Sequence, residues 1–360
     1  MNRRQYLHAL GVSATGALAG CAGLFETGRE STGEPPLVEN RPDAVYVPTH
    51  VEGMEMIGMH SVGRLRLALS YSYPHRFWLL DGDEPNRQDI GDSSIHLMAS
   101  VWDAETGRTI PSSNASATIT TASGEPVEDR ALWPMLSQNM GFHYGDNVSL
   151  DGDGTYEVQL TFGPVGTRRT GTFAGEFDDL IETTATFEFS QSDLEEIRYT
   201  LLEDRQGQRG AVEPMQMEMM PIPQLPQAQA LPGTLLGEGS SGDGQFVVSL
   251  QSEPPASVEG NQSYLGVSAR TPYNRFPLPF TSLSVRLARD GTSLFDGPLQ
   301  ATLDPNLGYH YGTGVEDVRE GDELTISVGA PPQVARHEGY ETAFLAMDPV
   351  ELTVGGNGGG

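Results

Sequence analysis

The chain has 360 residues and a formal net charge of −28, from 49 acidic and 21 basic residues, and every basic residue is an arginine. A field of this sign repels nucleic acid and anionic membrane surfaces, which excludes nucleic acid as a partner. An acidic, lysine-free surface on a globular protein is typical of a halophile, so the charge as a whole indicates a solvated surface and no particular site.

The N-terminus carries an export pattern. Arg3 and Arg4 form a twin-arginine pair, and a short apolar run then ends in Leu18-Ala19-Gly20-Cys21. Twin arginines mark export through the Tat route, and the run is too short to span a bilayer. The ending resembles a lipobox, so residues 1–21 are predicted to be a Tat lipoprotein signal. We expect the mature protein to be lipidated at Cys21 and anchored to the outer face of the cell membrane; an ordinary cleaved signal is the alternative.

Cys21 is the only cysteine, and lipidation would consume it. Disulfides, thiolate zinc sites and cysteine nucleophiles are then excluded from the mature chain. Any metal site must use histidine, methionine and carboxylate ligands.

Residues 22–42 are rich in Gly, Glu, Pro and Ser, which predicts a flexible tether. From 43 to 190 apolar residues alternate with polar ones, the pattern of half-buried strands. Several short strands over about 150 residues predict a first β-sandwich domain in this range. The clearest predicted strands are 64–71, 94–101, 155–162 and 184–189.

A helix and a linker are predicted over 191–244. Ser192 is a candidate N-cap ahead of acidic first-turn residues, and 206–244 is a linker rich in Met and Pro. Strand patterns resume over 245–355, which predicts a second β-sandwich domain, and 356–360 is a Gly-rich tail. The predicted strands of this second domain are 246–250, 263–268, 283–287, 324–328 and 350–354.

Two nearly identical heptads, NMGFHYG at 139–145 and NLGYHYG at 306–312, indicate an internal duplication. They are separated by an offset of 167. Later segments align at an offset of 168, which would place Arg169 opposite His337. The fold class predicted is therefore all-β, with two tandem sandwich domains and one short helix in the linker.

The stretch from Leu132–Met135 (LWPM) to Gly141–Asn147 (GFHYGDN) resembles the signature of the periplasmic iron-uptake proteins, also described as the ferrous-iron transport protein family. Ala335-Arg336-His337 resembles the family's later Gly-Arg-His motif. The resemblance implies an immunoglobulin-like sandwich that dimerises and holds copper or iron between subunits. A duplicated chain could then fold as an internal pseudo-dimer in which each domain completes the other's site.

The resemblance implies one metal site made of Met135, His143 and His337. The mirror site would combine His310 with Arg169, with Leu303 near the methionine position. Arginine stays protonated and cannot ligate a metal, so we expect one competent site and one degenerate site.

Two departures from the family leave alternatives open. The family places a His-x-Glu pair on an early strand, and the equivalent region is taken to be 64–68, which holds no ligand. His75 and His60, near this region, are substitute ligands. Met135 also lies one residue further from His143 than in the family, so Met140 is an alternative sulfur ligand. A Met, His, His set suits copper better than hard cations.

Each histidine also has a purely structural interpretation. His143 and His310 could be β-turn residues whose rings bond to the backbone, since Tyr-Gly follows each of them. His337 could be an exposed loop residue, His75 a packed edge residue and His96 a filler of core or surface.

Met215, Met217 and Met219 lie close together in the linker. Such segments resemble thioether clusters that capture Cu(I), but methionine also fills gaps in apolar packing. We favour a clasp over a hydrophobic face and leave metal binding as the alternative.

The sequence shows no Gly-x-Ser-x-Gly, no phosphate loop and no His-Glu-x-x-His motif, so we do not expect an enzyme. The function predicted is a lipid-anchored, extracytoplasmic protein that binds copper or iron for an uptake system, with a membrane metal permease as partner and a homodimer left open. The alternative is a structural or interaction surface lipoprotein of the same fold without a metal.

Overall fold

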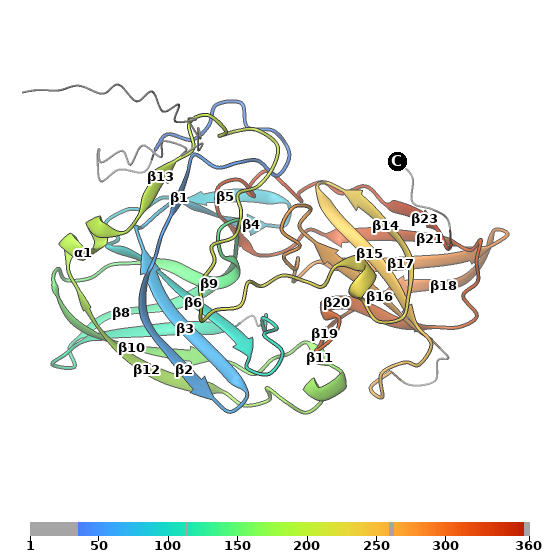
Figure 1. The fold of residues 1–360 in the computed structure, drawn as a ribbon, viewed down its shortest axis with the longest axis horizontal. Coiled ribbons are helices and arrows are strands. Elements are labelled where there is room, and N and C mark those ends of the chain that lie inside the picture. The colour runs from blue at the N-terminus through green and yellow to red at the C-terminus, as the bar shows by residue number, and fades with distance from the viewer. Residues whose placement is uncertain (1–34, 112–113, 259–262, 356–360) are drawn as a thin grey trace, which may run out of the picture.

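The computed structural model describes residues 35–111, 114–258 and 263–355. The predicted signal, most of the tether and the predicted tail lie outside these ranges. Figure 1 shows two β bodies, one built mainly from the first half of the chain and the other mainly from the second half. The predicted all-β fold of two tandem immunoglobulin-like sandwiches is confirmed. In the described ranges, no helix is long and apolar enough to cross a membrane.

The first body is one sheet that bends into two layers, in the order β12–β10–β7–β8–β9–β6–β3–β2. The bend lies in β8, because its first part pairs with β7 and its last part pairs with β9. The main strands are β2 (Glu55–Val62), β3 (Leu65–Ser72), β6 (Ile95–Asp103), β7 (Ala115–Thr121), β8 (Pro126–Ser137), β9 (Gly141–Val148), β10 (Gly154–Phe162) and β12 (Ile181–Phe189). A hairpin and a small separate sheet complete it: β4 (Phe77–Asp81) with β5 (Glu84–Gln88), and β1 (His50–Glu52) with β13 (Tyr199–Leu201).

The second body has a six-stranded sheet, β11–β19–β20–β16–β15–β14, in which β11 is Arg168–Arg169, and a four-stranded sheet, β18–β17–β21–β23. Its strands are β14 (Thr234–Ser241), β15 (Gly244–Gln251), β16 (Ser263–Arg270), β17 (Ser282–Arg289), β18 (Thr292–Pro298), β19 (Gln300–Asp304), β20 (Gly308–Val315), β21 (Glu323–Ala330) and β23 (Val350–Thr353). Within the described ranges, the helical segments are α1 (Gln191–Glu196), η1 (Gly171–Phe173) and η2 (Ala228–Ala230).

Alternation of apolar and polar residues explains why these segments are strands. In β10, Val158 and Leu160 are buried while Glu157 and Gln159 are exposed. Successive side chains of a strand point to opposite faces, so one face enters the core. Each fully buried Val or Leu stabilises the fold by roughly 1.5–3 kcal/mol.

The two bodies exchange short strands. β22 (Ala335–Arg336), from the second half of the chain, runs parallel to β8 with Ala335 opposite Met135. In return β11 (Arg168–Arg169), from the first half, runs parallel to β19 with Arg168 opposite Thr302. This reciprocal exchange is the predicted internal pseudo-dimer, and it carries residues of each half into the other's sheet.

The exchanged strands correct the alignment of the two halves. His337 N–H donates to the Leu136 carbonyl at 3.1 Å, and Thr170 N–H donates to the Leu303 carbonyl at 3.0 Å. Thr170 is therefore the counterpart of His337, and the prediction that Arg169 takes this place is wrong. The connection from β21 to β22 is one residue shorter than that from β10 to β11, which restores the offset of 167.

Two local predictions also differ from the structure. The N-cap of α1 is Ser190, whose hydroxyl accepts a hydrogen bond from Asp193 N–H at 3.1 Å, and Ser192 lies inside the helix. The stretch predicted to be a linker contains β14, which pairs with β15. Its glycines and serines weaken the alternation that would have identified a strand.

Candidate metal centre

The centre begins on β9, where the last five residues of the first heptad, GFHYG at 141–145, are strand and not turn. Gly141, with φ 74°, makes the turn, and His143 follows inside the strand with no exposed surface. The interpretation of His143 as a β-turn residue is therefore wrong, and the same holds for His310 in β20. In the sheet, His143 lies opposite Met135 of β8. Since side chains alternate, Gly145 and Asn147 share the face of His143.

His96 on β6 joins this face, because it lies opposite Asn147. Its ring centroid is 4.1 Å from that of His75, which precedes β4, and 6.5 Å from that of His143. His96 is fully buried among other histidines, so it is more than the filler of core or surface that the sequence suggested.

His337 reaches the cluster from the second half of the chain, directly after β22. Its ring centroid lies 4.6 Å from that of His75, 5.1 Å from that of His143 and 5.4 Å from that of His96. Among the described residues, a nitrogen of His75, one of His96 and one of His337 lie within 4.8 Å of one another. The strand exchange thus places His337 inside the cluster, although the sequence also allowed an exposed loop residue.

The free nitrogen of two rings can be assigned from hydrogen bonds. Asn147 Nδ2 donates to the His75 carbonyl at 2.8 Å, which leaves Asn147 Oδ1 as the acceptor for His96 Nδ1 at 2.8 Å. His143 Nδ1 lies 3.1 Å from the Gly141 carbonyl. Both Nδ1 atoms must carry the proton, so both Nε2 atoms present a lone pair.

These lone pairs face a protected space. The Nε2 atoms of His96, His143 and His337 are buried, and none of them has a hydrogen-bond partner within the described ranges. Buried polar atoms in proteins are normally paired, so several orphaned imidazole nitrogens in one place indicate a missing ligand. A metal ion would satisfy them, and imidazole nitrogen is a common metal ligand.

Gly145 keeps room for such an ion. A Cβ at this position would lie 2.8 Å from His96 Nε2 and 3.0 Å from both Met135 Sδ and the Leu97 carbonyl. The Met135 thioether and the His96 imidazole therefore border the same small space. This accounts for glycine in the His-Tyr-Gly sequence, since any larger residue would fill that space.

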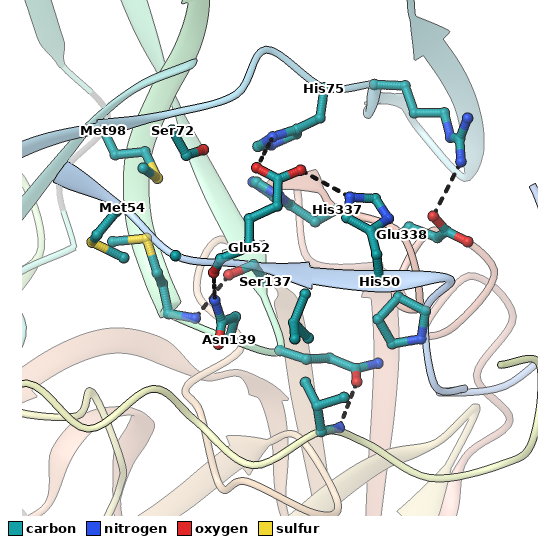
Figure 2. Close-up of a pocket in the computed structure, with 17 residues that line it drawn as sticks. His50, Glu52, Met54, Ser72, His75, Met98, Ser137, Asn139, His337 and Glu338 are labelled. Atoms are coloured by element: carbon teal, nitrogen blue, oxygen red, sulfur yellow. Dashed lines mark hydrogen bonds and ion pairs between the residues drawn. The ribbon is translucent and has the colours of Figure 1, made fainter. Parts of the chain in front are cut away.

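Glu52 and His50 on β1 were missed by the sequence interpretation. His50 Nε2 lies 2.8 Å from Glu52 Oε1, and Glu52 Oε2 forms an ion pair with His75 Nδ1 at 3.6 Å. Figure 2 shows Glu52 between His50, His75 and His337. A His-x-Glu sequence, His50-Val51-Glu52, thus lies beside the cluster, whereas β3, which covers most of 64–68, belongs to the sandwich core. The sequence His-Val-Glu can be read at 50–52, but apolar and polar residues alternate too weakly around it to predict a strand.

Burial determines the charge state of the cluster. It lowers the pKa of His143 to about 4, against a small rise from the Gly141 carbonyl. Burial and the charge of His75 hold the pKa of His96 well below its usual range, and burial and the other histidines do the same for the pKa of His337. Burial would raise the pKa of Glu52, but the charge of His75 and hydrogen bonds from His50 and His75 outweigh it and lower the pKa. Neutral imidazoles beside a carboxylate are the forms that bind metal.

The mirror position in the second half is closed by protein groups. Gly266 lies opposite Gly312, as Met98 lies opposite Gly145 in the first half. Two residues earlier on each strand, Tyr264 therefore occupies the position equivalent to His96. Its hydroxyl is 3.0 Å from His310 Nε2. His310 is fully buried and burial lowers its pKa to about 4.

A guanidinium occupies the rest of this mirror position. Arg168 donates to the Tyr264 hydroxyl and to Thr302 Oγ1, each at 2.9 Å. Thr302 lies opposite His310, as Met135 lies opposite His143 in the first half. The counterpart of Met135 is therefore Thr302 and not Leu303, just as the counterpart of His337 is Thr170 and not Arg169. His310 Nε2 is thus engaged, in contrast to His143 Nε2.

The remaining candidates lie around the centre. Met140 lines a pocket that reaches His75 and His337. Met215 N–H donates to the Asn139 carbonyl at 2.8 Å, and Met217 forms a β-bridge with Met220. Met219 is 69% exposed. The linker therefore touches the first domain beside the pocket.

The fold and this cluster define a two-domain β-sandwich protein with a histidine-rich, metal-binding type of centre between its halves. Residues 85–192 match the model of the family described as Fe2+ transport protein, which confirms the resemblance to the iron-uptake family in the first half. Residues 229–353 match a family described as a domain of unknown function, DUF7350.

Curated relatives and solved structures match parts of the chain. UPF0423 proteins of Brucella abortus and Brucella suis are 32% identical over 94 residues, 24% of this chain and 51% of theirs. The chain thus spans about half the length of the curated relatives it matches. A copper-bound variant of FetP from uropathogenic Escherichia coli strain F11 is 21% identical, with a TM-score of 0.30 over 38% of this chain and 97% of that one. A copper-bound variant of Campylobacter jejuni P19 is 16% identical, with a TM-score of 0.29 over 39% and 97%.

Proposed function

We propose that this protein binds a copper or iron ion between its two halves for an uptake system outside the cytoplasm. The observation that carries the proposal is the set of buried, unpartnered Nε2 atoms of His96, His143 and His337. His337 comes from the other half of the chain, so the centre forms only when both halves fold together. The match of residues 85–192 to the Fe2+ transport protein family supports the same function.

The donor set fits both metals. Imidazole nitrogens and the Met135 thioether suit copper, as the sequence predicted. Glu52 adds the carboxylate that the sequence interpretation considered missing, and a carboxylate with imidazoles suits ferrous iron. His75 and His50 hold Glu52 in place by an ion pair and a hydrogen bond, as outer residues of metal sites commonly do.

The cellular setting belongs to the same proposal. Arg3, Arg4 and Cys21 support Tat export and a lipid anchor. The FetP and P19 variants that are similar to part of this chain are copper-bound. A membrane metal permease is the partner this role requires. The function is binding and delivery of the ion, without catalysis.

Titration of the purified mature chain with Cu(II) and Fe(II), followed by metal analysis, tests the proposal. We expect one equivalent that is lost in both His143→Ala and His337→Ala. The matched control is His310→Ala, a histidine of the same motif whose Nε2 is already bonded to Tyr264, and it should keep the equivalent. Absence of binding at micromolar metal would contradict the proposal and leave a structural surface lipoprotein of the same fold.

A further inference from the structure

A second group of metal donors lies in the same pocket as the histidines. The pocket encloses a cavity of about 80 Å³ lined in part by Met54, Met98 and Met140. Figure 2 shows Met54 and Met98 on the left side of the pocket, with Glu52 between them and His50. None of these three methionines belongs to the centre described above, whose thioether is Met135.

Three separate segments place these methionines in the lining of one pocket. Met98 lies two residues after His96 on β6, so both side chains point to the same face. Met54 lies between β1 and β2, directly after the His50–Glu52 segment. Met140 sits in the turn before Gly141, where its N–H donates to Ser137 Oγ at 3.0 Å. Met98 is buried, and Met54 and Met140 are half-buried.

The surroundings of these methionines differ from an apolar core. Ser72, Ser137 and Asn139 line the same pocket, and Glu52 contributes a carboxylate. Methionine that only fills a gap would leave no cavity among polar groups. A neutral thioether is a weak hydrogen-bond acceptor, so these sulfur atoms gain little from their polar neighbours but can coordinate a soft cation.

We propose that Met54, Met98 and Met140 form a thioether site for a soft monovalent cation, Cu(I), beside the histidine centre. Thioether sulfur selects Cu(I) over harder divalent ions, and the Glu52 carboxylate compensates the single positive charge. This site goes beyond the proposed function and does not require metal at the histidines.

The Met-rich linker lies next to this site. Met215 N–H is bonded to the Asn139 carbonyl, one residue from Met140, and the exposed Met219 follows in the same segment. The methionines of the linker therefore lie near the side of the pocket that Met140 lines. They are a competing location for a soft-metal site, so the experiment must distinguish binding in the pocket from binding in the linker.

Titration with Ag(I), a redox-inert probe for Cu(I), tests the site in a His143→Ala/His337→Ala background. We expect one Ag(I) equivalent, and at least about 10-fold weaker binding after Met54→Leu/Met98→Leu/Met140→Leu. The matched control is Met56→Leu/Met59→Leu on β2, which lies outside the pocket lining and should bind as its parent does. Leucine keeps the side-chain volume. The same three methionine substitutions in a chain with His143 and His337 intact should still bind Cu(II), which checks that they leave the protein folded.

Two results would overturn the proposal. One is unchanged Ag(I) binding in the triple pocket variant. The other is loss of the site in Met215→Leu/Met217→Leu/Met219→Leu while the pocket variant retains it, because this would place the soft site in the linker. X-ray absorption of the Ag(I)-loaded Met215→Leu/Met217→Leu/Met219→Leu variant gives a measurement without pocket variants. Sulfur neighbours support the site, because the linker thioethers are absent, and a shell of nitrogen and oxygen alone overturns it.

Discussion

His143 and His337 come from opposite halves of the chain, and their ring centroids lie 5.1 Å apart. The contact depends on β22, which leaves the second half to pair with β8 of the first. A metal ion bound there would tie the two halves together. Ligand binding to the native state stabilises it by mass action, so metal should raise the unfolding temperature of the whole chain.

Gly145→Ala should abolish metal binding, because the added Cβ would lie 2.8 Å from His96 Nε2 and 3.0 Å from Met135 Sδ. Gly154→Ala is the matched control: its backbone φ is not positive, and the nearest atom would be 3.7 Å away. Titration with Cu(II) after a check of folding by circular dichroism measures the effect. Full binding by a folded Gly145→Ala variant would show that the ion does not use this space.

Asn147→Ala should weaken metal binding by about 10–100-fold. Asn147 Oδ1 accepts a hydrogen bond from His96 Nδ1–H. Without this hydrogen bond, His96 can adopt the tautomer that carries its proton on Nε2, where the metal would bind. Asn139→Ala is a control near the centre: within the described ranges its side-chain amide donates to the Glu52 backbone carbonyl and to no imidazole. Equal affinities for the two variants would argue against a role for Asn147 in orienting the ring.

Glu52→Gln should reduce Fe(II) affinity more than Cu(II) affinity, because the amide keeps the shape and removes the hard anionic donor. Glu55→Gln on the neighbouring strand β2 tests the general effect of losing one negative charge. Parallel titrations with the two ions give the ratio of affinities. A ratio unchanged by Glu52→Gln would mean that the carboxylate only orients His50 and His75.

The strands were predictable and the centre was only partly so, for physical reasons. Alternation identified β10 from Val158 and Leu160 because burial on one face leaves a local pattern. His96 and Glu52 gained their meaning only from neighbours distant in sequence. The parallel pairing of β22 with β8 likewise has no local signal, and a one-residue difference in the preceding connection shifted the alignment of Thr170 with His337.

The metal-free protein should lose stability between about pH 6.5 and pH 4. Burial lowers the pKa of His143 and His310 to about 4 in the folded state, so the unfolded chain binds their protons first as the pH falls. Each such histidine contributes stability above pH 6.5 that is lost through pH 4, about 3 kcal/mol in size. Urea unfolding at several pH values measures it.

His310→Gln isolates one of these contributions. The variant removes a buried titrating group outside the metal centre, so its stability should depend less steeply on pH than that of the wild type. Gln251→Glu, which places a new carboxyl opposite Tyr264 in the sheet, should add a dependence of its own and serves as a contrast. Identical slopes for His310→Gln and the wild type would contradict neutral burial of His310.

Rebuilding the mirror position should create a second metal site. The pairing registers define four substitutions, each to the residue at the equivalent position of the metal centre. Arg168→Ala removes the guanidinium, and Thr170→His introduces the counterpart of His337. Tyr264→His and Thr302→Met introduce the counterparts of His96 and Met135. Together with His310 these supply three imidazoles and a thioether. The second site should bind more weakly, because no change supplies a counterpart of the Glu52 carboxylate.

Metal analysis should then give two copper equivalents per chain, of which His143→Ala removes one and His310→Ala the other. Arg168→Ala alone is the control, because it opens the space but leaves Tyr264 and Thr302 in place, and it should still bind one equivalent. One equivalent in the folded fourfold variant would mean that shared strand register is insufficient for a centre. This result would indicate that a metal site of this kind also needs the Glu52 carboxylate, which His50 and His75 hold in place.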